Sequence, residues 1–246
     1  MVFGSRMKTV LLLLGLAGWL GTLTPALPAA EKPHLVDAGT FVVLVKGQRI
    51  ATETFHIEQS PTVNTASAEF KSESGEKAVQ KAELQITPAG DLRKYEWREL
   101  SPGKSQIVVE PADQFLVERI VPEPPQRPVQ QSFIMPLSTV ILDDYFFSQR
   151  EILAWRYLAQ ACGGKLENCR PARTQFGVLV PRQRLPLTAS LAYVGVEKVM
   201  VNGTERELNR INLRLGDDPE WALYLDGSLK VIRIDIPAES TQVIRE

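Results

Sequence analysis

The sequence has few of the residues and combinations on which most enzymes and metal sites depend. It contains two histidines in 246 residues, His34 and His56, which are too few for a multi-histidine metal site. His34 lies near the expected start of the exported chain and His56 on the outward face of a predicted strand, so we interpret both as solvated. The serine-nucleophile elbow, the zinc-protease helix motif, the P-loop and the dinucleotide-binding glycine pattern are missing. We therefore predict a protein that is not an enzyme and that uses no metal and no cofactor.

The sequence also has no large excess of positive or negative charge. The chain has 28 Lys and Arg against 29 Asp and Glu, for a formal net charge of -1, and no basic block stands out. Binding to nucleic acid depends on a concentrated positive surface, so we expect no nucleic-acid partner. The hydrophobic fraction of 44% is sufficient for a folded core and excludes a disordered polymer.

One segment is apolar enough to enter a bilayer. A short basic region precedes the apolar run at residues 10–23, and a stretch of small residues follows at 24–30. This order is typical of a secretory signal peptide, and the run is short for a spanning helix, which needs about 20 apolar residues. The alternative is an uncleaved N-terminal anchor. We expect a signal peptide over residues 1–30, a single β-rich domain over 31–246, no stable membrane span after cleavage, and a periplasmic or secreted protein.

The two cysteines, Cys162 and Cys169, both lie in the exported part of the chain. In an oxidising compartment, two cysteines this close in sequence predict one disulfide that closes a tight loop. Two cysteines alone do not complete a tetrahedral metal site, and neither histidine is nearby.

Short strands and turns dominate the pattern from residue 39 onward. Phe55 and Ile57 alternate with polar neighbours and are expected to face inward, and Asn202-Gly203 is a strong hairpin signal. The four prolines of residues 121–128 indicate either a stiff loop between two strands of one sheet or a linker between two domains; we favour the loop. We predict a mostly antiparallel β fold, a strongly curved sheet or open half-barrel, because so many strands would otherwise leave long unpaired edges.

One helix interrupts this pattern, predicted at about residues 138–161 and ended by Gly163-Gly164. Its apolar stripe is broad enough to pack across a curved sheet. Arg156 falls on the apolar side and is expected to extend its charged end to water. We interpret Asp143-Asp144 as favourable charges at the start of the helix and Asp217-Asp218 as a turn. The charged residues expected opposite the apolar stripe are Asp143, Asp144, Arg150 and Glu151.

Aromatic side chains on this helix and on the facing strands form the candidate ligand-binding set. They would line an apolar cavity, or alternatively fill a solid core. The six candidates are Tyr145, Phe146, Trp155, Tyr157, Trp97 and Trp221.

The layout resembles the periplasmic lipoprotein-localisation-factor (LolA/LolB-like) superfamily. The opening hairpin at residues 39–59 (GTFVVLVKGQRIATETFHIEQ) and the ending at 221–236 (WALYLDGSLKVIRIDI) carry the resemblance. It implies an open β-barrel closed by a helix and, in the carriers, an apolar cavity that takes up acyl chains. The disulfide loop and the proline-rich segment depart from that pattern. We expect an exported protein that binds a lipid or a lipidated polypeptide in a half-barrel; the alternative is an interaction or scaffold module of the cell envelope, with a filled core and a protein partner.

Overall fold

The structure is a computed structural model and describes residues 32–73, 75, 77–169 and 173–246. The expected signal peptide over residues 1–30 lies outside the described residues. The first eight strands are β1 (His34–Val45), β2 (Gln48–Gln59), β3 (Asn64–Ser72), β4 (Val79–Ile86), β5 (Leu92–Ser101), β6 (Gln106–Ala112), β7 (Phe115–Val121) and β8 (Val129–Phe133). The remaining elements are β9 (Val140–Ile141), α1 (Ser148–Cys162), η1 (Leu166–Asn168), β10 (Thr174–Val180), η2 (Pro181–Gln183), β11 (Leu185–Val201), β12 (Thr204–Leu215), β13 (Trp221–Leu225), β14 (Val231–Ile236), η3 (Pro237–Glu239) and β15 (Thr241–Arg245).

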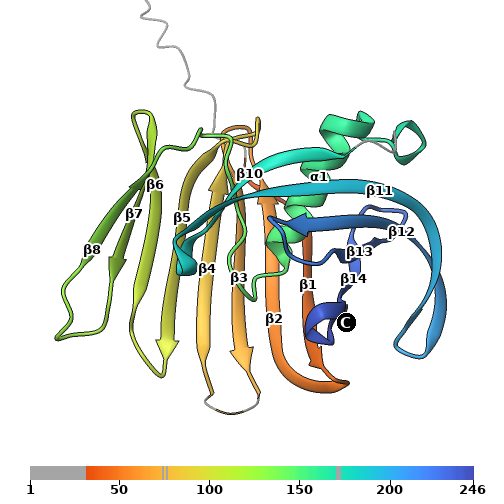
Figure 1. The fold of residues 1–246 in the computed structure, drawn as a ribbon, viewed down its shortest axis with the longest axis horizontal. Coiled ribbons are helices and arrows are strands. Elements are labelled where there is room, and N and C mark those ends of the chain that lie inside the picture. Colours follow the sequence, from red (N-terminus) through yellow and green to blue (C-terminus); the bar gives the residue numbers. More distant parts are fainter. Residues whose placement is uncertain (1–31, 74, 76, 170–172) are drawn as a thin grey trace, which may run out of the picture. The chain divides into compact units, whose positions relative to one another are not determined.

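All the described strands belong to one 15-stranded sheet with the order β8-β7-β6-β5-β4-β3-β2-β1-β15-β14-β13-β12-β11-β10-β9 (Figure 1). Neighbours run antiparallel except for the short parallel pair β9 and β10. The first strand pairs with the last, β15, in the middle of the order. β8 and β9 are the two edges and do not pair with each other, so the sheet is open. The expectation of a mostly β chain with one α-helix is confirmed for the described residues.

Local sequence accounts for much of this arrangement. Asn202 and Gly203 join β11 to β12 with φ of 49° and 78°, the left-handed pair that a two-residue hairpin turn requires. Along β2, Phe55 and Ile57 are buried while His56 between them is exposed, as the two-residue period of a strand predicts. The proline-rich segment at residues 121–128 connects β7 to β8, which are neighbours in the sheet.

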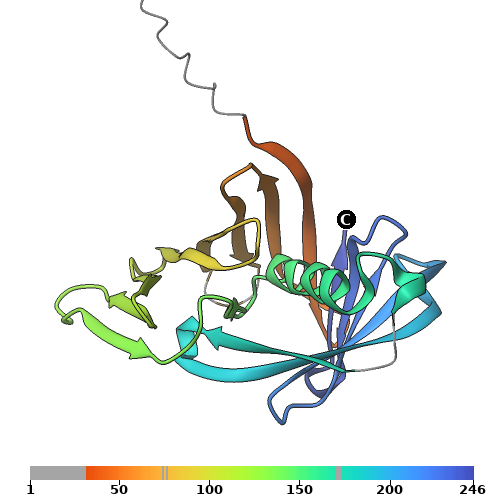
Figure 2. The ribbon, with the colours of Figure 1, turned by 90° about the horizontal axis from the view of Figure 1, so that it is seen from above.

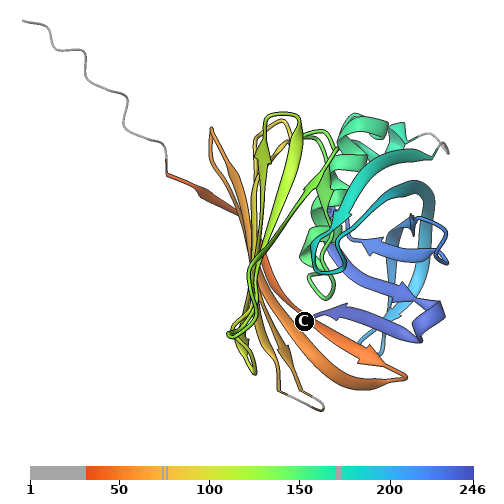
Figure 3. The same cartoon turned by 60° about the vertical axis from the view of Figure 1, so that its left-hand side comes forward.

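The sheet curls around α1. Seen from above, the helix lies between β1–β4 and the strands β10 and β11 (Figure 2). The view in Figure 3 shows the N-terminal strands and the C-terminal strands as two facing walls, with α1 between them. Hydrogen bonds tie α1 to both walls: the Phe147 amide donates to the Glu53 carboxylate of β2 at 2.6 Å, and the Tyr193 amide of β11 donates to the Tyr157 hydroxyl at 2.8 Å. The main apolar core therefore lies on the concave face, around the helix.

The helix begins at Ser148 rather than near residue 138. Val140 and Ile141 instead form β9, and their backbone pairs with β10. Both side chains are buried, and the pairing satisfies backbone groups that a longer helix would otherwise have satisfied. The C-terminal end agrees with the expectation: α1 ends at Cys162, and Gly163 follows with φ of 58°.

A second, smaller apolar cluster lies on the opposite face of the C-terminal strands. It joins the tip of the β11–β12 hairpin to β13, β14 and β15 through Val201, Leu208, Ala222, Tyr224, Ile232 and Ile244. Arg233 of β14 donates to the backbone carbonyl of Met200 at 2.5 Å and fastens the hairpin tip there. Among the described residues, no helix has the length and the apolar character needed to cross a lipid bilayer.

Candidate functional site

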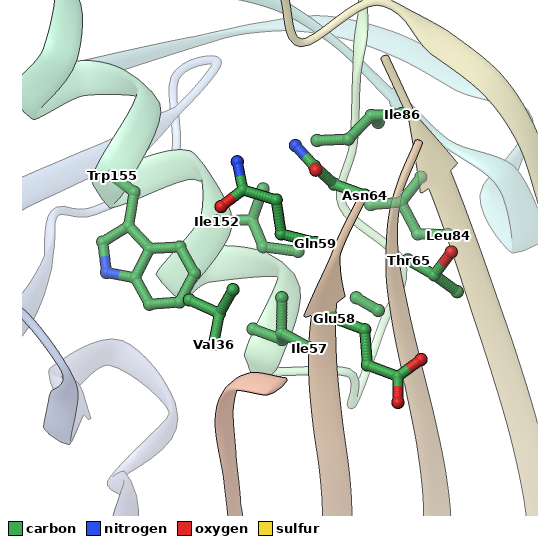
Figure 4. Close-up of a pocket in the computed structure, with 11 residues that line it drawn as sticks. Val36, Ile57, Glu58, Gln59, Asn64, Thr65, Leu84, Ile86, Ile152 and Trp155 are labelled. Atoms are coloured by element: carbon green, nitrogen blue, oxygen red, sulfur yellow. The ribbon is translucent and has the colours of Figure 1, made fainter. Parts of the chain in front are cut away.

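An apolar cavity of about 120 Å³ lies between α1 and the neighbouring ends of β1–β4 (Figure 4). The strand period places its lining, because Ile57, Ala66 and Leu84 all take inward positions on adjacent strands. The helix contributes Ile152 and Trp155, which are three residues apart and therefore lie on one face. The complete lining is Val36, Ile57, Glu58, Gln59, Asn64, Thr65, Ala66, Leu84, Ile86, Ile152 and Trp155.

Trp155 is held in place at the helix side of the cavity. Its indole N–H donates to the backbone carbonyl of Leu229, in the turn between β13 and β14, at 2.6 Å. With its polar atom satisfied, the indole ring presents an apolar surface to the cavity. The ring therefore forms a fixed wall opposite Ile57 and Val36.

Two amide side chains lie at the strand side of the cavity. Gln59 and Asn64 are cross-strand partners at the end of the β2–β3 hairpin. The intervening turn is fastened by Ser60, whose hydroxyl donates to the Val63 carbonyl at 2.7 Å and accepts from the Val63 amide at 3.1 Å. Both amide groups extend toward α1 (Figure 4). The oxygen Oδ1 of Asn64 is buried and makes no hydrogen bond within the part of the chain that the structure describes.

Of the six aromatic residues expected to line a cavity, Trp155 alone does so. Phe146 and Tyr157 are fully buried in the packed core, and Trp97 is 6% exposed beneath the guanidinium of Arg182. Of the remaining two, Tyr145 is 46% exposed and stacks on Phe70, and Trp221 is half-buried beneath Arg150. Three of the six, Trp97, Tyr145 and Phe146, surround the guanidinium of Arg182, which lies 5.5, 5.6 and 6.0 Å from their ring centres. The six do not line one common cavity, and most of the half-barrel interior is filled by side chains.

The aliphatic lining of the cavity was not predicted from the sequence. The sequence signal for this lining is the set of inward-facing aliphatic positions near the ends of β2, β3 and β4, such as Ile57 and Leu84, which are not aromatic. The predicted pairing of Cys162 and Cys169 is confirmed: a disulfide joins the last residue of α1 to Cys169, just after η1.

Three charged residues expected opposite the apolar stripe are buried instead. Asp143, Arg150 and Glu151 are between 0% and 3% exposed, because α1 is surrounded by sheet and has no free face at its first turn. Asp143 and Asp144 precede the helix, so they are not its first residues. Their interpretation as part of the helix start is wrong.

The N-terminal end of α1 is capped by a residue distant in sequence. Phe147 at the cap position offers no side-chain hydrogen bond of its own. Glu53, fully buried on β2, accepts from the Phe147 amide at 2.6 Å and from the Ser148 amide and hydroxyl at 3.2 Å and 2.6 Å. Burial raises the pKa of Glu53 from 4.5 to about 7, while the hydrogen bonds from Ser148 and Phe147 oppose this rise.

A second buried carboxyl is Glu151 of α1, which lies against side chains of β1 and β15. A carboxyl oxygen of Glu151 accepts from Arg245 at 3.3 Å, and Arg245 also donates to both oxygens of Asp37 at 2.7 and 2.8 Å. Burial, together with the neighbouring Asp37, raises the pKa of Glu151 to about 9. Burial also acts to raise the pKa of Asp37, but hydrogen bonds from Glu151, Lys230 and Arg245 outweigh it and hold that pKa below 3.8. The pair therefore combines a neutral Glu151 with a charged Asp37 at neutral pH.

Arg182 of η2, in the connection between β10 and β11, contacts the facing strands β4 and β5. Arg182 donates to Asp143 at 2.8 Å and to Gln80 of β4 at 3.1 Å, and its guanidinium lies 5.5 Å from the ring centre of Trp97 on β5. Burial raises the pKa of Asp143, while Arg182 and the hydroxyl of Tyr95 counter that effect. Side-chain contacts thus hold the β10–β11 end of the sheet against β4 and β5.

Arg156 also differs from the expectation of a freely solvated charge. It is half-buried, donates to the Gly90 carbonyl at 3.2 Å and lies 5.6 Å from the ring centre of Phe176. It therefore links α1 to the turn between β4 and β5.

Glu118 of β7 is the buried carboxyl without a hydrogen-bond partner in the described part of the chain. It is 0% exposed and lies opposite Val109, which is equally buried on the same face of the sheet. Burial raises the pKa of Glu118 to about 7, with Arg184 acting to lower it and Asp143 to raise it. No three His, Cys, Asp or Glu side chains in the described residues are grouped so that they could hold a metal ion.

Comparison with known proteins identifies a fold and no family. No protein-family model matches the chain, and no curated protein matches it. A structural match is the crystal structure of a beta-barrel-like protein of domain of unknown function DUF1849 from Brucella abortus, with a TM-score of 0.52 and 8% sequence identity, covering 89% of this chain and 97% of that chain. At this identity the likeness concerns the fold alone, and the resemblance to the LolA/LolB-like superfamily is not confirmed. The chain has a beta-barrel-like fold built on an open sheet.

Proposed function

We propose that this is an exported, non-enzymatic binding protein that holds one short apolar group in the cavity between α1 and β1–β4. The observation that carries the proposal is the cavity itself, with its aliphatic lining and the fixed indole of Trp155. Apolar pockets with a few polar groups at one side are typical of small-molecule sites. The disulfide between Cys162 and Cys169 and the signal-peptide pattern at residues 1–30 support export.

The volume limits what the cavity holds. At about 120 Å³ it is slightly smaller than an engineered apolar cavity of about 150 Å³ that binds benzene. It therefore accepts a group of about six carbon atoms, such as the end of a single acyl chain. The LolA/LolB-like resemblance supports a lipid or lipidated polypeptide as the source of that group, with the rest of the ligand outside the cavity.

Cavity filling tests this proposal. Ala66→Leu directs a larger side chain into the space, whereas Ser67→Leu adds the same apolar group on the opposite face of β3. We expect titration calorimetry to detect saturable benzene binding by the wild type and by Ser67→Leu, and none by Ala66→Leu. The absence of binding by the wild type, or unchanged binding by Ala66→Leu, would refute the proposal.

The filled interior favours a second candidate function, an interaction module of the cell envelope. Phe146, Leu153 and Tyr157 are all 0% exposed and occupy space that a larger ligand would need. Apolar side chains are exposed instead near the β7–β8 edge, where Val129 is 45% and Ile134 is 88% exposed. A photo-crosslinking residue at position 134 in intact cells is expected to give a discrete protein adduct, with exposed Lys198 as the control position. No adduct at 134, or the same adducts at both positions, would contradict this candidate.

A further inference from the structure

The polarity of the cavity is uneven. Ile57, Leu84 and Trp155 give three of its sides an apolar surface. At the fourth side, the buried Oδ1 of Asn64 finds no donor among the described residues. A buried acceptor without a donor costs free energy that a ligand can recover by supplying one. The site is therefore complete when a donor group lies against Asn64.

The charges around the cavity restrict the class of ligand further. None of the described lining residues is cationic, so a carboxylate or phosphate placed there would have the amide N–H groups of Gln59 and Asn64 but no counter-charge. The single charged residue of the lining is Glu58, and its carboxylate points away from Trp155 and Ile152 (Figure 4). A cation would thus gain little from it. The polar group of the ligand is neutral.

We propose that the cavity selects neutral amphiphiles in which a hydrogen-bond donor is attached directly to a short alkyl segment, as in a primary alcohol or an amide. The ligand donates a hydrogen bond to Oδ1 of Asn64, and its alkyl segment packs between Ile57, Leu84, Ile152 and Trp155. This inference rests on the proposed function, since it assigns the ligand class of the same cavity. Gln59, at the exposed end of its strand and opposite Asn64, can donate to the oxygen of the same polar group.

Two isomeric probes separate the hydrogen bond from the apolar contact. 1-Hexanol and methyl pentyl ether have the same atoms and similar apolar surface, but the ether has no donor. We expect calorimetry on the full mature protein to show about tenfold tighter binding of 1-hexanol, the ratio that corresponds to one net hydrogen bond of about 1.4 kcal/mol. Hexanoate at neutral pH is expected to bind more weakly than either probe, because its charge has no partner.

Asn64→Leu is the matched variant, since leucine has a similar size and no acceptor. It is expected to bind the ether at least as well as the wild type and to lose the preference for 1-hexanol. Equal binding of the two isomers by the wild type, or a preference that persists in Asn64→Leu, would overturn the inference while leaving the proposed function standing. If neither isomer nor benzene binds the wild type, the proposed function fails together with the inference. The comparison of the isomers on the wild type remains decisive even if the variant does not fold.

Discussion

Replacing Glu118 by leucine is expected to stabilise the protein, which is the opposite of what most substitutions at buried positions do. Glu118 is fully buried and its two carboxylate oxygens have no hydrogen-bond partner in the described chain. An apolar side chain of similar size avoids the cost of burying an unpaired polar group, about 1–3 kcal/mol. Imperfect packing of the new side chain costs up to about 1.5 kcal/mol of this stabilisation. The expected net gain under mildly acidic conditions is about 1 kcal/mol.

The stabilisation of the Glu118→Leu variant relative to the wild type is expected to increase with pH. The pKa of Glu118 is about 7 in the folded protein against 4.5 for the ordinary group, so the folded state holds this proton more tightly than the unfolded state. The stability that the proton provides is complete below pH 4.5 and is lost as the pH rises through 7. At about 1.4 kcal/mol per pH unit, the wild type loses about 2–3 kcal/mol between pH 5 and pH 8 through this group, and the leucine variant does not.

Urea unfolding of both proteins at pH 5 and pH 8 measures the effect. Glu53 and Glu151 also titrate, but they do so in both proteins and cancel in the difference. Glu118→Gln is the control, because it removes the titration but keeps an unpartnered polar group. We expect its unfolding free energy to equal that of the wild type at pH 5 and to exceed it at pH 8. A leucine variant less stable than the wild type at pH 8, or a gap that does not change with pH, would refute the reasoning.

Three further perturbations test the contacts around α1. Glu53→Ala leaves the amides of residues 147 and 148 without an acceptor and is expected to cost about 3 kcal/mol in urea unfolding; a loss within error of zero would contradict the capping role. Arg182→Met leaves Asp143 buried without its ion-pair partner, so we expect a loss of about 3 kcal/mol, and an unchanged stability would show that the contact with β4 and β5 contributes nothing. Reduction of the disulfide between Cys162 and Cys169 opens a short loop and is expected to cost about 2–3 kcal/mol, which calorimetry would record as a melting temperature lower by about 5–10 °C; an equal melting temperature would argue against the entropic account.

For the buried carboxyl of Glu53, the local sequence pattern predicts the burial but not the hydrogen-bond partners. The alternation that places Phe55 and Ile57 inward also places Glu53 inward, so its burial follows from β2 alone. Its partner does not. The amides of Phe147 and Ser148 lie 94 and 95 residues away, and no pattern near Glu53 points to them.

For the charged residues of α1, the local pattern predicted the wrong environment. A helical wheel assumes that one side of a helix meets water, which makes Arg150 and Glu151 solvent-facing. In this fold the sheet surrounds the first turn of the helix, and both residues are buried. Hydrogen bonds offset their desolvation: Arg245 of the distant strand β15 donates to Glu151, and Arg150 donates to the carbonyl of Asp143 in the segment just before the helix.

Local sequence by itself determined the elements whose causes are local: the alternation of the strands, the left-handed turn at Asn202-Gly203, the end of the helix before Gly163 and the pairing of two neighbouring cysteines. The tertiary structure decided where α1 begins, which charges are buried, and that the apolar space lies beside Ile57 and Trp155 rather than among the aromatic residues. The physical reason is that burial and ion pairing depend on which distant strands curl around the helix. That curvature is a property of the whole sheet, which neither the period of one strand nor the stripe of one helix contains.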